Sequence, residues 1–135
     1  MRSIRGRRSR SQALVEFALA ISIFMLLVLG TFDLARAYLA YTVVTNAARE
    51  AGRYGAAHVG ESGWQTAAAQ AGVNLAIGVD TDPAVLKLTV GTQPLDALQY
   101  ITVTGTYQFR SVTPMVGALL GNPITIQVDT WQLAG

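Results

Sequence analysis

The chain has 135 residues, of which 51% are hydrophobic and only 13% charged, and its formal net charge is +2. This length suits one domain, and the charged share is about half that of an ordinary soluble domain. The chain has no cysteine, which excludes a disulfide framework, thiolate metal sites and a cysteine nucleophile.

The N-terminus is strongly basic. Five arginines and no acid lie in the first ten residues, namely Arg2, Arg5, Arg7, Arg8 and Arg10. Such a tail on a near-neutral body is typical of a topology signal, a lipid-binding patch or a nucleic-acid arm. Because it adjoins an apolar segment and has no interleaved aromatic residues, we interpret it as a topology signal and leader and expect no nucleic-acid partner.

An uncharged apolar run covers residues 17–32. Its sixteen residues give roughly 24 Å of helix, a little short of a ~30 Å hydrocarbon core. Extension back through residues 13–15 reaches spanning length but includes Glu16. The positive-inside rule then predicts a cytoplasmic N-terminus, with the chain beyond Phe32 outside. A signal peptide cut at residues 35–37 is the alternative, but Glu16 and the length of the run disfavour it.

The helical pattern continues from residue 33 to about residue 55 and becomes amphipathic. We expect one helix over residues 13–55, with Gly30 as a place where it could bend. The predicted apolar face comprises Leu34, Ala37, Tyr41, Val44, Ala48 and Gly52. Leu39 and Val43 interrupt the charged face, so they are candidate contacts with a neighbouring subunit; singly exposed apolar residues are also ordinary.

The remaining residues predict a small α+β domain. A capping box at Ser62 and Gln65 indicates a second helix that starts near Trp64. After Pro83 the period changes to two, which predicts three antiparallel strands, with connections at residues 91–96 and 110–123. We expect the amphipathic part of the long helix to cover the apolar face of this sheet.

Residue patterns that carry chemistry are scarce. His58 is the only histidine and has no evident partner nearby in sequence. Asp80 and Asp82 fit a turn better than a calcium loop. We therefore expect no enzymatic activity, no metal and no cofactor.

Three segments together resemble one family: SQALVEFAL at residues 11–19, GTFD at 30–33 and NAAREAGRYGA at 46–56. They resemble the TadE-like minor pilins, or pseudopilins, of tight-adherence pili, which are similar to type IV pilins. The resemblance implies a pilin-like fold, a long transmembrane helix packed on a small antiparallel sheet. It divides the chain into a basic leader (1–11), a transmembrane or filament-core helix (12–32), an amphipathic continuation (33–55) and an extracytoplasmic globular domain (56–135).

The resemblance also implies roles for particular residues. A prepilin peptidase would cut between Ser11 and Gln12, although the usual residue before the cut is glycine. Glu16, with Phe17 beside it, would set the register of subunits in a filament by pairing with a freed N-terminal amine. The alternative for Glu16 is a carboxylate that reaches the cytoplasmic edge of the membrane and pairs with Arg10.

The same resemblance implies the partners and the location. The partners would be other pilin-like subunits, the prepilin peptidase, an inner-membrane assembly platform and, before assembly, membrane lipid. The chain would lie in the bacterial inner membrane and reach the cell exterior in a pilus. The rival function is a single-pass binding or adhesion module that never polymerises.

Overall fold

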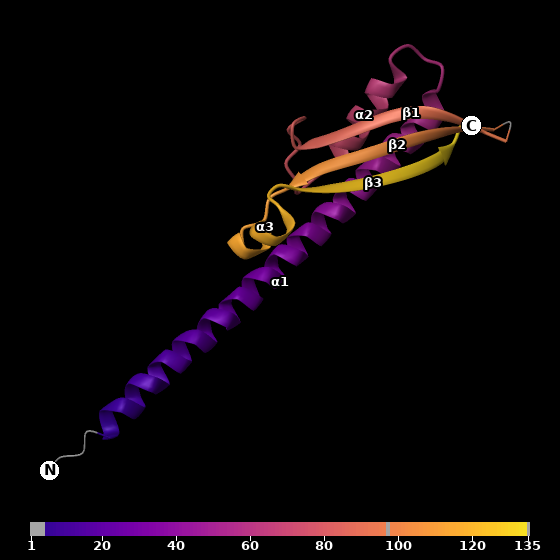
Figure 1. Ribbon diagram of the computed structural model, residues 1–135. Helices are drawn as coiled ribbons and strands as arrows, with labels where there is room; N and C mark the ends of the chain where they lie inside the picture. Colours follow the sequence, from indigo (N-terminus) through magenta and orange to yellow (C-terminus); the bar gives the residue numbers. More distant parts are fainter. Residues whose placement is uncertain (1–4, 97, 135) are drawn as a thin grey trace.

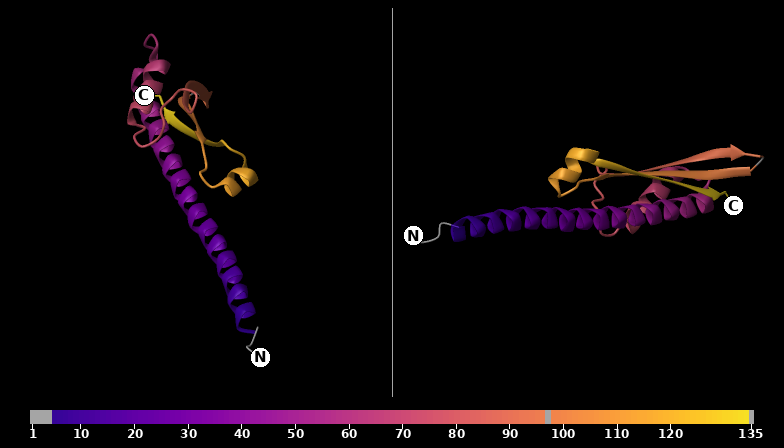
Figure 2. Two further views of the ribbon diagram at one scale, coloured as in Figure 1. Left: turned by 90° about the vertical axis from the view of Figure 1, so that its left-hand side faces the viewer. Right: turned by 60° about the horizontal axis from the view of Figure 1, so that its bottom comes forward.

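The computed structural model describes residues 5–96 and 98–134, and it confirms the predicted α+β class. One long helix, α1 (Arg5–His58), runs past a small domain built from α2 (Trp64–Leu75) and three strands. The strands β1 (Leu86–Leu95), β2 (Leu98–Phe109) and β3 (Ile124–Leu133) form an antiparallel sheet in the order β1-β2-β3. A short helix, α3 (Pro114–Leu120), connects β2 to β3. The N-terminal half of α1 extends away from this domain as a free rod (Figures 1 and 2).

The helix α1 is longer than the predicted span of 13–55 and passes through Gly30 without a break. Its 54 residues correspond to about 80 Å. Two polar side chains of the apolar run bond back to the helix, because Ser22 Oγ donates to the Ala18 carbonyl and Thr31 Oγ1 to the Leu27 carbonyl, both at 2.8 Å. These bonds satisfy hydroxyl groups that would otherwise be costly in a lipid environment.

The C-terminal half of α1 covers the inner face of the sheet, as expected, and α2 packs beside it. The buried face of α1 is only partly the predicted one. Val44, Ala48 and Gly52 are buried, whereas Leu34 and Tyr41 are exposed. Ala40, Ala47 and Ala51 are buried instead, so the contact face is a seam of small residues that lets α1 approach its neighbours closely.

Along each strand, apolar side chains on the inner face of the sheet alternate with polar side chains on the outer face. The buried strand residues include Leu86, Leu88, Ile101, Val103 and Val128. On the outer face, Thr104 Oγ1 donates to Asp129 Oδ1 at 2.7 Å across the β2–β3 pair. This pattern confirms the period-two prediction for all three strands.

Two predicted details of the small domain are wrong. The start of α2 is not a capping box, because Gly63 takes the N-cap position in a left-handed conformation (φ 75°) without any side-chain cap. Ser62 therefore lies outside the cap position. The predicted connection at residues 91–96 is mostly strand, since β1 pairs with β2 as far as Leu95 and Leu98. Pro94 is tolerated there because β1 is an edge strand.

Candidate functional site

The free half of α1 is an apolar surface that the chain does not cover. Every residue from 10 to 29 is exposed. Among the described residues, one helix segment, Arg10–His58, is long and apolar enough to span a membrane. None of the residues in its most apolar stretch is buried. An apolar surface of this extent needs lipid or neighbouring protein around it.

The residues predicted to act in processing and assembly lie together on this rod. Ser11, Gln12, Glu16 and Phe17 are all helical and exposed. Gln12 and Glu16 are four residues apart and therefore share one face of α1. Glu16 forms no ion pair or hydrogen bond with any side chain that the structure describes, Arg10 included.

Asp33, which follows the apolar run directly, has a role that the sequence analysis missed. Its carboxylate is 2% exposed. It accepts hydrogen bonds from the backbone N–H groups of Val112, at 3.0 and 3.1 Å, and of Thr113, at 2.7 Å. Arg36 Nη1 lies 3.4 Å from the same carboxylate. Asp33 therefore ties the start of α3 to the point where α1 leaves the apolar run.

These donors also set the protonation state of Asp33. The hydrogen bonds from Thr113 and then Val112 lower its pKa below the ordinary 3.8, against a smaller opposing effect of burial. The carboxylate is therefore ionised at neutral pH, where its charge strengthens both bonds. The one sequence signal for this role was an acid isolated at the end of an apolar segment.

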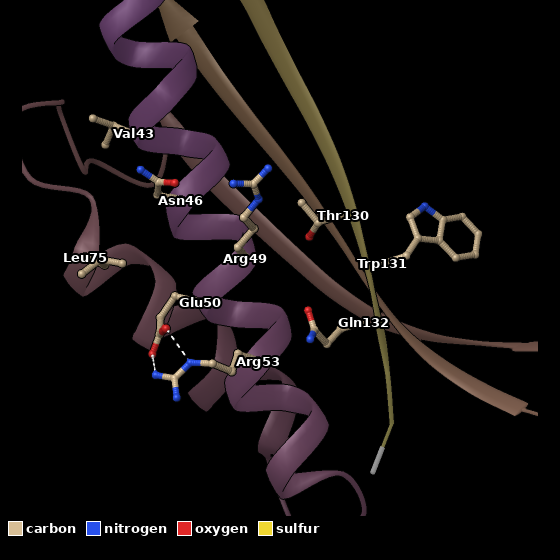
Figure 3. Close-up of a pocket in the computed structure, with 9 residues that line it drawn as sticks. All are labelled: Val43, Asn46, Arg49, Glu50, Arg53, Leu75, Thr130, Trp131 and Gln132. Atoms are coloured by element: carbon tan, nitrogen blue, oxygen red, sulfur yellow. Dashed lines mark hydrogen bonds and ion pairs between the residues drawn. The ribbon is translucent and has the colours of Figure 1, made fainter.

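A shallow groove lies between α1, α2 and β3 (Figure 3). In it, Arg53 donates to Glu50 through Nε, at 3.0 Å, and through Nη2, at 2.6 Å. The hydrogen bonds from Arg53 lower the pKa of Glu50. The groove is lined by Val43, Asn46, Arg49, Glu50, Arg53, Leu75, Thr130, Trp131 and Gln132.

The two candidate inter-subunit residues differ in their surroundings. Leu39 is 55% exposed and remains available to a neighbour. Val43 is partly buried and packs against the core of its own domain, at the rim of the groove. Val43 thus lies in a groove that combines apolar and charged side chains. This groove is separate from the rod that carries Glu16.

His58, the last residue of α1, and the two aspartates of the loop after α2 have local partners. His58 stacks on Tyr54 with ring centroids 4.1 Å apart. Asp80 Oδ1 accepts from the Asp82 N–H at 3.0 Å, and Asp82 Oδ1 from the Ala84 N–H at 2.8 Å, which confirms the predicted turn. Within the described part of the chain, no three His, Cys, Asp or Glu side chains gather as metal ligands would.

Part of α1 is similar to a known protein family. Residues 12–53, which include the apolar run, Glu16, Asp33 and much of the buried seam, match the family model described as TadE-like protein. No curated protein and no solved structure matches the chain. The match ends before α2 and the sheet. Over residues 12–53, which is less than half of the chain, the protein is therefore similar to TadE-like proteins, and this similarity is confined to α1.

Proposed function

We propose that the chain is a pilin-like structural subunit, a minor pilin or pseudopilin that enters a tight-adherence pilus. The observation that carries this proposal is the division of α1 into two halves. The C-terminal half is buried against its own sheet, while the N-terminal half is an exposed apolar rod that carries Glu16. Such a rod fits lipid before assembly and the apolar helices of neighbouring subunits afterwards.

Glu16 sets the register in this proposal. A carboxylate that is buried among apolar helices loses its hydration, which is costly unless a partner replaces it. The described side chains of its own subunit offer no such partner. Cleavage between Ser11 and Gln12 would free an amine one helical turn before Glu16. Pairing with that amine would neutralise the carboxylate, and pairing with the amine of a neighbour would favour one axial alignment of subunits over all others.

Filament incorporation of Glu16 variants tests the proposal. The variants Glu16→Ala and Glu16→Gln are expressed in pilus-producing cells, and this chain is quantified in the membrane fraction and in sheared pili. Removal of a carboxylate eases insertion, since an ionised acid at the bilayer centre costs ~2.5–3.5 kcal/mol. Both variants should therefore reach the membrane at wild-type levels and be depleted from sheared pili.

The control variant is Leu19→Ala, which shortens another exposed side chain of the rod but removes no charge, and it should be depleted from sheared pili much less than either Glu16 variant. Normal incorporation of both Glu16 variants would contradict the register role. If the wild-type chain stays in membranes while pili are sheared off, the non-polymerising binding module is the better account.

A further inference from the structure

The helix α3 presents an apolar surface to solvent. None of its residues is buried, and Val112, Met115, Leu119 and Leu120 are 64%, 55%, 75% and 70% exposed. No charged residue occurs between Arg110 and Asp129. Four exposed apolar side chains on one short segment exceed the scattered single residues that are ordinary on a protein surface.

The position of α3 along α1 is fixed by Asp33. The carboxylate of Asp33 holds the N–H groups of Val112 and Thr113, and Asp33 follows Phe32, the last residue of the uncharged run. The start of α3 therefore lies at the height where the apolar part of α1 ends. In Figures 1 and 2, α3 occupies the end of the small domain that is nearer the free rod.

Two guanidinium groups lie at the same height. Arg36 is one helical turn beyond Phe32, and its Cζ lies 5.5 Å from the centroid of the Phe109 ring. Arg36 and Arg110 line one hollow together with Asp80 and Gln108. Cationic side chains next to an apolar surface match the phosphate layer and the upper acyl region of a bilayer.

We propose that residues 112–120 form a membrane foot, which inserts into the headgroup–acyl boundary of the same bilayer that α1 spans. The apolar side chains of the foot extend the lipid-facing surface of α1 sideways, while Arg36 and Arg110 lie at the level of the lipid phosphates. Through Asp33 the foot sets the height and tilt of the globular domain above the membrane. This proposal needs α1 in a membrane but no filament, so it stands or fails independently of pilus assembly.

Depth-dependent fluorescence quenching tests the foot. Because the chain has no cysteine, a single Leu119→Cys substitution in the full chain gives a unique site for an environment-sensitive fluorophore. The matched control is Gln127→Cys, on the exposed outer face of β3. Both are reconstituted into phosphatidylethanolamine–phosphatidylglycerol vesicles and exposed to aqueous iodide or to lipids with a nitroxide near the headgroup.

The foot predicts strong nitroxide quenching at position 119, with iodide quenching several-fold weaker than at position 127. Iodide access at 119 equal to that at 127 would overturn the proposal. Protection from iodide without nitroxide quenching would also overturn it and would indicate that protein, such as a second copy, covers α3.

A second variant tests the anchor. Asp33→Asn in the Leu119→Cys background weakens the hold on the start of α3 and should raise iodide access at 119. With the exposed Trp131 replaced by phenylalanine, unchanged emission of the buried Trp64 verifies that the domain remains folded. Unchanged access in the folded Asp33→Asn protein would contradict the role of Asp33 in placing the foot.

Discussion

The close approach of α2 to α1 makes a sharp prediction at Gly72. A Cβ atom there would lie 2.5 Å from the Ala47 carbonyl oxygen, 2.6 Å from Leu88 Cδ1 and 3.0 Å from Ala51 Cβ. The Leu88 methyl group can rotate away, but the Ala47 carbonyl is part of the backbone of α1 and cannot. The variant Gly72→Ala therefore forces α2 away from α1.

The expected magnitude follows from a matched glycine. At Gly52, also buried and helical, a Cβ would meet its nearest neighbour, Gln132 Cβ, at 3.6 Å, an ordinary contact. Both substitutions gain the same helix propensity, about 1 kcal/mol. The difference between their free energies of unfolding therefore measures the cost of overpacking alone. Overpacking costs about 1–3 kcal/mol, and the backbone clash places Gly72→Ala near the upper end. We expect Gly72→Ala to be about 2–3 kcal/mol less stable than Gly52→Ala.

Urea unfolding of the full chain in detergent micelles measures this difference. Trp64 is a suitable probe because it is 7% exposed, and the exposed Trp131 is replaced by phenylalanine in every sample. Equal urea midpoints for Gly72→Ala and Gly52→Ala would refute the packing of α2 on α1 described above.

Two further predictions concern charged groups. The pKa of Asp33 is lower in the folded state than its ordinary 3.8, so the contribution of Asp33 to stability is present above that value and is lost as the pH falls through the folded pKa. The difference in stability between wild type and Asp33→Asn should therefore disappear in that acidic range. A difference that does not depend on pH would contradict the role of the ionised carboxylate. The variant Glu50→Gln weakens an ion pair whose Arg53 side chain is 74% exposed. Because solvent screens such a pair, the urea midpoint should remain almost unchanged. A large decrease in the midpoint would contradict this and would show that the pair stabilises the groove.

The sequence predicted the elements whose signals are local. The apolar run, the helix near Trp64 and the alternating strands were predicted from the spacing of apolar residues. This spacing can be recognised without knowing which elements pack together. The buried face of α1 was predicted less well, since alanine and glycine lie on several sides of the helix. Contact with the sheet and α2 decides that Ala40 and Ala47 are buried while Leu34 and Tyr41 are exposed.

The features that were missed depend on distant parts of the chain. Asp33 was noted only as the last residue of the GTFD segment, and its backbone donors lie 79 and 80 residues away. The strand β1 extends past Gly91 because β2 pairs with it, which no local pattern indicates. The seven residues of α3 are too few for a helical period to stand out from a short apolar connection.

N-terminal sequencing of this chain in sheared pili tests the central claim, entry into a filament after processing, most directly. The chain should be released without protease treatment, because trypsin would itself cut after Arg10 and obscure the native end. The account predicts that the filament fraction contains the chain and that its first residue is Gln12. A chain that is present only in the membrane fraction, or that still begins at Met1, would contradict it.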